Sequence, residues 1–178
     1  NPHARFIDEK EVETMLRKAG LYPKGELMST VDTKKIEELF RVNDFIERVE
    51  CYKTSDDKLC LTIEQRTPIM YVLPDNKHGY FVDAKGNVIS KTNYAANLIV
   101  VTGNVDQKFA RTELKDLAVF IQQDEFWNSQ LEQVYVEKDK HGVPVLEVVP
   151  RVGNHIVNLG HIDEYEKKFE HLKELYKK

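Results

Sequence analysis

The stretch LCLTIEQRTPIMYVL, residues 59–73, decides the fold of this chain. Over residues 59–64, apolar and more polar side chains alternate, which is the period of a half-buried strand. Residues 65–68 interrupt the alternation, and a second apolar run, Ile69–Leu73, follows at once. Because Pro68 cannot donate a hydrogen bond to a neighbouring strand, the stretch predicts two strands rather than one continuous central strand. We therefore expect it to join the end of one structural unit to the start of another.

The composition is that of a globular chain. Its 178 residues are 41% hydrophobic and 31% charged, which suits one sizeable domain or two small ones. The net charge of −4 and the pI of about 5.9 argue against a protein that mainly binds nucleic acid or an anionic membrane surface. No stretch of the sequence approaches the roughly 20 apolar residues that cross a bilayer. Because the chain begins at Asn1 rather than Met, we expect it to be a fragment of a longer protein.

The segment before the junction predicts two helices and two strands. Asp8 is a good N-cap, Glu11 completes a capping box three residues on, and Gly20 ends the first helix. Asp32 caps the second helix. A unit of about 60 residues is only marginally stable alone, so we expect it to depend on its neighbour. The expected strands are Phe45–Tyr52 and Leu59–Gln65, joined by a turn at Thr54–Asp57.

The segment after the junction predicts a β domain. Two helices are expected, Thr112–Gln123 and one that Asp163 caps. Short turns, including Val152–Asn154, separate successive strands and favour antiparallel pairing. We therefore predict an α+β fold, in which residues 1–68 form a domain of two helices on a small sheet. Residues 69–178 then form a mostly antiparallel β domain with two flanking helices. The expected strands are Ile69–Leu73, Tyr80–Asp83, Asn87–Ile89, Leu98–Thr102, Leu131–Glu137, Val143–Val149 and His155–Leu159.

The residue types that carry catalysis are scattered along the chain. The four serines lack the context of a nucleophile elbow, and no glycine-rich phosphate-binding loop occurs. The six histidines do not cluster, and His155 and His161 lack the partners of a zinc motif. We therefore expect no catalytic, cofactor-binding or metal-binding residues, and no enzymatic activity.

The two cysteines, Cys51 and Cys60, allow two hypotheses. One hairpin register places them directly opposite each other, where they can form a disulfide. The alternation of apolar residues favours another register, such as Cys51 opposite Leu59, which puts the apolar side chains of both strands on one face. A slip of one residue reverses every side chain, so the two registers conflict unless a β-bulge intervenes. A Cys51–Cys60 disulfide and two separate thiols both remain open.

Four short motifs follow one another in a specific order. The helix–helix–strand–strand pattern leads into Gln65-Arg66-Thr67-Pro68-Ile69. Next, Tyr80–Gly86 is an apolar run that ends in Asp-x-x-Gly, and Leu98–Gly103 is an apolar strand that ends in glycine. Finally, Gly153–Gly160 is a hairpin segment that ends in Leu-Gly. Each motif alone is weak, but their order and spacing together are specific.

This series resembles the POTRA domain and the β domain of the FtsQ/DivIB cell-division proteins. That family commonly has Glu-Arg-x-Pro at the junction, where this chain has Gln65. It usually has Leu-Pro-Val-Leu-x-Gly in the central strand, where this chain has Ile99 in place of the proline. The last hairpin of the family leads into a helix with a lysine, here Lys167 or Lys168. The resemblance extends over residues 6–176.

The resemblance implies a non-enzymatic divisome scaffold. Such proteins are single-pass inner-membrane proteins whose periplasmic part binds FtsB, FtsL and other division proteins, among which we include septal cell-wall synthases. They thereby help to control septal peptidoglycan synthesis. The resemblance thus implies that this chain lies in the periplasm, with a membrane anchor upstream, and that it uses neither a cofactor nor nucleic acid. The alternative is another POTRA-containing protein, namely an outer-membrane assembly or transport factor.

The resemblance also assigns roles to individual residues. It makes Arg66, Thr67 and Pro68 the domain junction, where they fix the relative orientation of the two domains. It also places the chain in an oxidising compartment, where a disulfide between Cys51 and Cys60 becomes plausible.

A partner-binding edge follows from the same resemblance. The family usually continues past the last helix into strands that carry much of the FtsB-binding surface, and we expect those strands to be missing after Lys178. An uncovered edge strand recruits an extended segment of a partner through main-chain hydrogen bonds. We expect Pro144 and Pro150 to mark where pairing at this edge is interrupted. The predicted edge comprises Val145, Glu147, Val149, Ile156 and Asn158.

Overall fold

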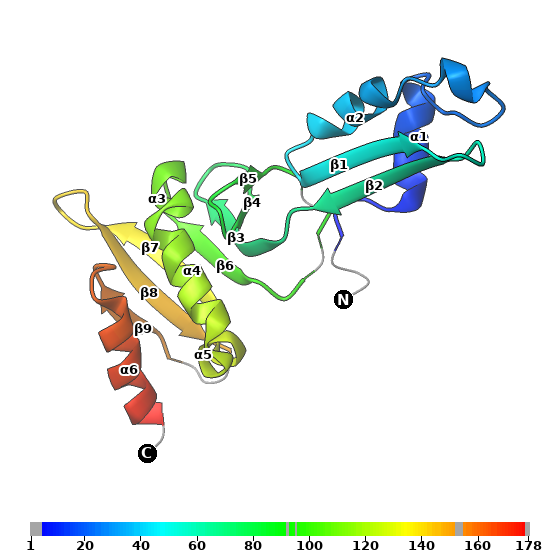
Figure 1. The fold of residues 1–178 in the computed structure, drawn as a ribbon. Coiled ribbons are helices and arrows are strands. Elements are labelled where there is room, and N and C mark those ends of the chain that lie inside the picture. The colour runs from blue at the N-terminus through cyan, green and yellow to red at the C-terminus, as the bar shows by residue number, and fades with distance from the viewer. Residues whose placement is uncertain (1–4, 92, 95, 152–154, 177–178) are drawn as a thin grey trace. The chain divides into compact units, whose positions relative to one another are not determined.

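The computed structural model describes residues 5–91, 93–94, 96–151 and 155–176. The chain forms two compact units (Figure 1). The N-terminal unit comprises Asn1–Arg66 and Ser90–Ala96, and the C-terminal unit comprises Thr67–Ile89 and Asn97–Lys178. The predicted α+β fold class, with a first domain of two helices on a small sheet followed by a β domain, is confirmed.

The helices of the N-terminal unit begin at the predicted caps. The Asp8 carboxylate accepts a hydrogen bond from the Glu11 N–H at 2.8 Å, and the Glu11 carboxylate accepts one from the Asp8 N–H at 3.1 Å. This capping box starts α1 (Glu9–Lys18), and the Asp32 carboxylate caps α2 (Thr33–Arg41) through the N–H groups of Lys34 and Lys35. A short 3₁₀ helix, η1 (Met28–Thr30), lies between them. Both cap predictions are confirmed.

A hairpin forms the sheet of this unit. Among the described residues it consists of β1 (Ile46–Lys53) and β2 (Leu59–Gln65), which pair antiparallel. Helix α2 packs on β1 and buries Ile36 and Phe40. The Glu37 carboxylate accepts a hydrogen bond from the Cys51 N–H at 2.9 Å, so α2 also satisfies a main-chain donor of β1. Two strands alone are marginal in water, and α2 supplies the covering layer that they need.

A segment from between β5 and β6 completes the N-terminal unit. Although Ser90–Ala96 follows strands of the C-terminal unit in the chain, it packs with the first 66 residues. The Ser90 N–H donates to the Asp44 carboxylate at 2.8 Å, and the Asn93 amide donates to the Phe6 carbonyl at 2.9 Å. The predicted boundary after Pro68 did not include this return of the chain. No local pattern reveals it, because its partners lie far away in the sequence.

The hairpin register separates the two cysteines. Cys51 lies opposite Leu61, and Cys60 lies opposite Tyr52. This register belongs to the type that the apolar alternation favours, because it points Val49 and Cys51 toward the core while Cys60 points to the other face. Both thiols are free, so the structure does not form the hypothesised Cys51–Cys60 disulfide. Burial raises the pKa of the Cys51 thiol.

We therefore expect two free thiols per chain in protein that has never been reduced. Reaction with Ellman's reagent after unfolding in denaturant measures this number directly. Pretreatment with a reducing agent, followed by its removal, is the control and should leave the number unchanged. A gain of two thiols on reduction would instead show that Cys51 and Cys60 form a disulfide, which would require a shifted hairpin register.

The sheet of the C-terminal unit is mixed. Among the described residues it has seven strands in the order β5-β4-β3-β6-β7-β8-β9. The outer pairings are antiparallel as predicted, but β6 pairs parallel with both β3 and β7. Parallel neighbours need long crossover connections, and helices form the one between β6 and β7. The strands are β3 (Pro68–Pro74), β4 (Tyr80–Asp83), β5 (Val88–Ile89), β6 (Ile99–Gly103), β7 (Leu131–Lys138), β8 (Pro144–Pro150) and β9 (Val157–Gly160).

The described part of this unit has four helices, not the two that the sequence predicted. They are α3 (Gln107–Arg111), α4 (Glu113–Gln123), α5 (Glu125–Gln130) and α6 (Tyr165–Tyr176). Helices α3 and α5 are too short to show a helical period, but an aspartate caps each one, Asp106 and Asp124. The ribbons of α4, α5 and α6 lie beside the sheet (Figure 1). Their apolar side chains share one core with it. The turn predicted at Val152–Asn154 lies outside the described residues.

Candidate functional site

The sheet of the C-terminal unit ends at β9. Strand β8 pairs with β7 on one side and with β9 on the other, so its main chain is already engaged. Strand β9 pairs only with β8 among the described strands, and the opposite edge of its main chain is the end of the sheet. Pro144 and Pro150 are the first and last residues of β8. The pairing with β9 occupies only the middle of β8, from Leu146 to Val148, and a register shift interrupts it.

The helices of the core cover one face of the C-terminal sheet, and the opposite face has no such helix among the described residues. Along β8, Leu146 and Val148 are buried against the helices, and the intervening side chains are half-buried on the opposite face. The strand pairings place side chains of β3, β6, β7 and β9 beside them on that face. We call this surface the open face. It comprises Tyr71, Val100, Thr102, Gln133, Tyr135, Val145, Glu147, Val149 and Asn158.

The structure brings most of the predicted edge residues together. Val145, Glu147 and Val149 alternate along β8 on the open face, and Asn158 of β9 lies directly opposite Glu147. Ile156 precedes β9 and is 63% exposed. Of β8 and β9, only β9 has a main-chain edge that no described strand pairs with, whereas the three residues of β8 can offer side chains. Their role in binding remains a prediction.

The sequence reasoning missed the contributions of β6 and β7 to the open face. The Gln133 amide donates to the Thr102 hydroxyl at 2.6 Å, and the Tyr135 hydroxyl donates to the Glu137 carboxylate at 3.2 Å. The alternation of LEQVYVEK, residues 131–138, carried the signal, since it marks one buried and one exposed face. These polar pairs make the centre of the open face mixed rather than apolar.

Polar contacts fix the segment between β9 and α6. The Lys168 ammonium donates to the His161 carbonyl at 2.7 Å and to the Asp163 carboxylate at 3.3 Å. Lys168, not Lys167, therefore ties the helix back to the end of the hairpin. The first helical bond runs from the Lys168 N–H to the Glu164 carbonyl, and Asp163 binds a lysine side chain instead of capping the helix. The predicted cap at Asp163 is corrected accordingly.

Two further contacts hold α6 and β9 in place. The Lys173 ammonium lies 2.8 Å from the Asp124 carboxylate at the start of α5, and it holds the pKa of that carboxyl below its ordinary value. The His161 imidazole lies 3.1 Å from the Asp139 carboxylate in the turn between β7 and β8. The pKa of Asp139 is lowered first by the hydrogen bond from the Val143 N–H and then by His161. The edge strand is thus held at the helix after it and at the neighbouring turn.

The predicted junction residues occupy the passage from β2 to β3. The Arg66 N–H donates to the Phe45 carbonyl, and its guanidinium donates to the Asp44 carbonyl, both at 2.9 Å. Thr67 is exposed, whereas Pro68 is buried and opens β3. The preceding Gln65 accepts hydrogen bonds from the N–H groups of Phe6 and Ile7 through its side chain. That Arg66, Thr67 and Pro68 fix the relative orientation of the two domains remains a prediction.

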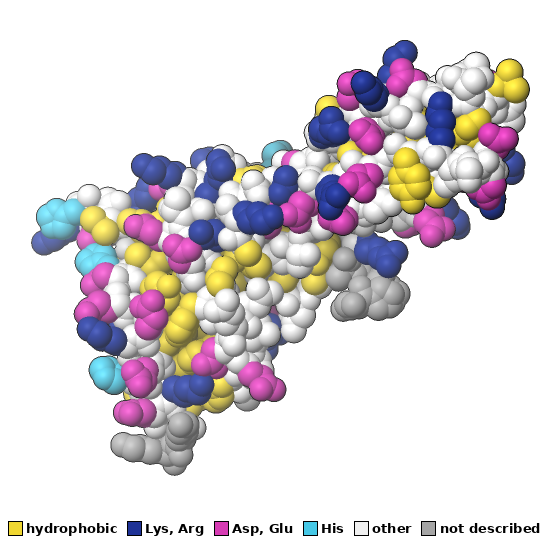
Figure 2. Space-filling view, in the orientation of Figure 1, with side chains coloured by type: hydrophobic (Ala, Val, Ile, Leu, Met, Phe, Trp, Pro, Cys, Tyr) yellow, Lys and Arg dark blue, Asp and Glu magenta, His cyan; other side chains and the backbone are white. Residues whose placement is uncertain are grey.

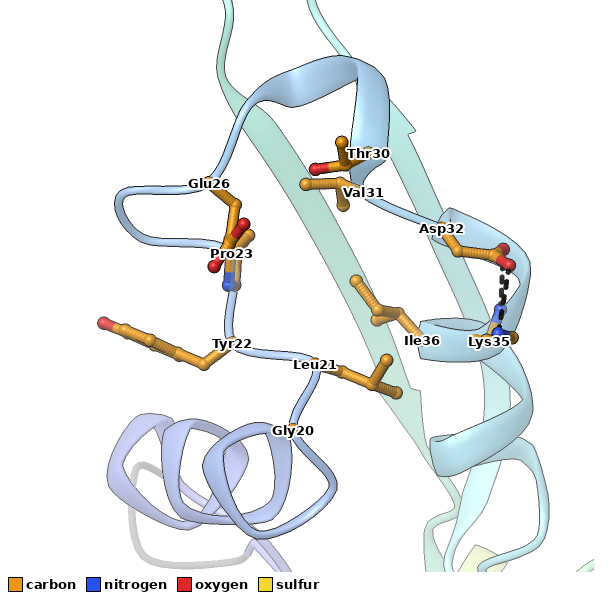
Figure 3. Close-up of a pocket in the computed structure, with 10 residues that line it drawn as sticks. All are labelled: Gly20, Leu21, Tyr22, Pro23, Glu26, Thr30, Val31, Asp32, Lys35 and Ile36. Carbon is orange, nitrogen blue, oxygen red and sulfur yellow. Dashed lines mark hydrogen bonds and ion pairs between the residues drawn. The ribbon is translucent and has the colours of Figure 1, made fainter.

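The N-terminal unit has a hollow of about 340 Å³ between the end of α1, the loop after it and the start of α2 (Figure 3). Leu21, Val31 and Ile36 form its apolar part. The Thr30 hydroxyl donates to the Leu27 carbonyl, and the Asp32 carboxylate caps α2 and lies near the Lys35 ammonium. These polar groups serve the local structure around the hollow.

The charged side chains of the N-terminal unit are dispersed. Basic and acidic side chains alternate over the visible surface of the N-terminal unit (Figure 2). Across the described ranges, no three histidine, cysteine, aspartate or glutamate side chains come close enough together to hold a metal ion. None of the helices described is both long and apolar enough to span a bilayer.

Replacing Lys173 with methionine should loosen α6. We expect a loss of about 0.5–1 kcal/mol in the free energy of unfolding at pH 7, because the partly exposed ion pair with Asp124 is removed. A carboxyl with a lowered pKa stabilises the fold above its unfolded pKa of about 3.9 and loses this effect as the pH falls through the folded pKa. The difference between the two proteins should therefore shrink toward acid pH, as urea unfolding at several pH values would measure.

Lys167→Met is the matched control, because Lys167 pairs with Glu164 in an exposed position on the same helix. It should leave the free energy of unfolding nearly unchanged. Equal losses in both variants, or a loss in Lys173→Met that does not depend on pH, would contradict a specific role for the Lys173–Asp124 pair.

Comparison with known families agrees with this architecture. A family model described as FtsQ/DivIB, C-terminal related, matches residues 67–178, and a model described as a POTRA-like domain matches residues 1–64. No curated protein gives a significant match to the chain. The match of the second unit does not favour the alternative of an outer-membrane assembly or transport factor. The chain therefore belongs to the FtsQ/DivIB C-terminal related family and carries a POTRA-like domain in front of that region.

Proposed function

We propose that this chain is the extracytoplasmic part of a non-enzymatic divisome scaffold that binds FtsB- and FtsL-like proteins. Membership of the FtsQ/DivIB family supports a general role as a cell-division scaffold. The observation that carries the finer proposal is the position of β9 at the end of the sheet, beside the open face. Through such binding the protein would help to control septal peptidoglycan synthesis, with septal cell-wall synthases as further partners.

The binding mode rests on the physics of sheet edges. An edge strand presents main-chain N–H and C=O groups in a fixed row, and an extended peptide satisfies them by adding a strand. Strand β9 has four residues, so its main chain alone gives a short docking site. The half-buried side chains of Val145, Glu147 and Val149 lie on the neighbouring strand and widen the surface that a partner can cover. Main-chain pairing would provide affinity, and these side chains would provide specificity.

We also propose that the chain lies in the periplasm and is tethered to the inner membrane by a single span upstream. Family membership supports this location, because FtsQ-type domains are the extracytoplasmic parts of membrane proteins. A tethered scaffold meets its partners in two dimensions, which raises their effective concentration and lets a modest interface suffice.

The edge proposal predicts the effect of a double substitution, Ile156→Asp with Glu147→Lys. Ile156 is 63% exposed and Glu147 is half-buried on the open face, so both replacements should leave the fold intact. We expect the affinity for the periplasmic segment of an FtsB-like partner to fall by about tenfold or more, since an apolar contact is lost and a charge is reversed. Isothermal titration calorimetry measures the affinity, and circular dichroism checks the fold.

Leu27→Asp is the matched control, because Leu27 is a 73% exposed aliphatic residue of the N-terminal unit. It should bind the FtsB-like segment as the unaltered protein does. Equal affinities of the double variant and this control would sink the proposal that the β8–β9 edge is the docking surface, even if binding itself is observed.

Complementation tests the cellular role separately from the edge. In a strain that lacks its own FtsQ-type protein, the full-length protein should relieve filamentation, and the double variant should do so poorly. A chimera in which an unrelated periplasmic domain replaces this chain should fail. Rescue by the chimera would refute the scaffold role, because it would make the periplasmic part dispensable.

A further inference from the structure

A rigid turn joins β4 to β5 in the C-terminal unit. The Asp83 side chain is only 5% exposed, and its carboxylate accepts hydrogen bonds from the N–H groups of Lys85 and Asn87 at 2.9 and 2.8 Å. Gly86 has a φ of +80°, and a Cβ there would lie 2.6 Å from the Arg111 carbonyl oxygen. Only glycine fits this position, so the Asp-x-x-Gly motif holds the turn in one conformation against the end of α3.

The contact with α3 orients a guanidinium group. The Arg111 Nε donates to the Gly86 carbonyl at 2.7 Å, which leaves the two terminal nitrogens of the guanidinium. No described residue accepts a hydrogen bond from them or from the Lys108 ammonium. A guanidinium fixed through Nε presents its remaining donors as a planar fork, which suits a phosphate or carboxylate.

These groups surround a hollow of about 330 Å³. Three of the six residues that line it are cationic, and none is acidic, although the chain as a whole carries a net charge of −4. The stem of Lys115 also passes beside Gly86, and its ammonium pairs with Asp116. Lys and Arg side chains gather over α3 in the space-filling view (Figure 2). The lining consists of Lys85, Gly86, Gln107, Lys108, Arg111 and Thr112.

We propose that this hollow binds the phosphate group of an anionic ligand. Arg111 and Lys108 would supply the charged donors, and the Gln107 amide would supply a neutral one, whereas the Thr112 hydroxyl already donates to the Lys108 carbonyl at 2.8 Å. A concave, compact cluster favours a single multivalent anion over a long polyanion, and the overall negative charge disfavours a nucleic acid or a membrane surface. The site lies on α3 and the β4–β5 turn, away from the β8–β9 edge in the strand order, so it is independent of the proposed function.

Nuclear magnetic resonance titration of the ¹⁵N-labelled chain tests this site, with inorganic phosphate as the probe. Chloride keeps the ionic strength constant during the titration. We expect saturable shifts of the amide signals of Gly86, Lys108 and Thr112. Lys108→Gln should weaken the apparent affinity by about threefold to tenfold, because one charged donor is removed from an exposed site. Lys140→Gln removes the same charge from the turn between β7 and β8 and should have no effect.

Two further arms identify the source of the phosphate. Vesicles of phosphatidylcholine with and without phosphatidylglycerol test a lipid headgroup. If the chain binds the anionic vesicles and Lys108→Gln abolishes this binding, the ligand is such a headgroup. Saturation by inorganic phosphate without vesicle binding would assign it to a small phosphorylated ligand. Three results would overturn the proposal. The first is the absence of both saturable shifts and vesicle binding, and the second is an equal loss of affinity in both lysine variants. The third is that the chain binds poly-glutamate but does not bind phosphate.

Discussion

The C-terminal unit depends on the packing of β6 between β3 and β7 beneath α4. Val101, Val134 and Val136 are at most 2% exposed, and they meet Leu114 and Leu117 of the helix in the same core. Parallel pairing on both sides of β6 requires a crossover to β7, and α3, α4 and α5 provide it. These helices cover one face of the sheet, and α6 joins them on that face. The open face and the β9 edge result from this arrangement.

Helix α6 helps to hold the edge strand in place, because Leu159 of β9 and Phe169 of α6 belong to the same core. Strand β9 is short, and its pairing with β8 is interrupted by a register shift. The helix compensates by burying Phe169 against Trp127, with ring centroids 4.9 Å apart. The contacts of Lys168 and Lys173 then fix the start and the end of this helix. A short, well-anchored edge can accept a partner strand while offering little template for aggregation.

Local signals in the sequence predicted the elements that depend on nearby residues. The caps at Asp8 and Asp32 and the strand Leu59–Gln65 are where the sequence predicted them, because capping and alternation act within a few residues. The register of the first hairpin followed the apolar pattern, which outweighed the hypothesis that Cys51 and Cys60 pair.

Other features depend on partners far away in the chain. The parallel pairing of β6 and the return of Ser90–Ala96 to the N-terminal unit leave no local trace. Helix α5 has six residues, fewer than two turns, so its apolar residues show no period. The predicted edge combined residues of β8 and β9. The strand order shows that β8 is an interior strand and β9 the terminal one, and this order depends on pairings between distant segments.

Hydrogen exchange at the β9 edge tests the central claim most directly. Amides at a sheet edge that have no hydrogen-bond partner exchange rapidly with solvent, and a partner strand that pairs with them slows this exchange. On addition of an FtsB-like periplasmic segment, the account predicts new protection in Val157–Gly160 and no change in the β1–β2 hairpin. Tight binding without added protection in Val157–Gly160, or with protection confined to Ile46–Gln65, would contradict it.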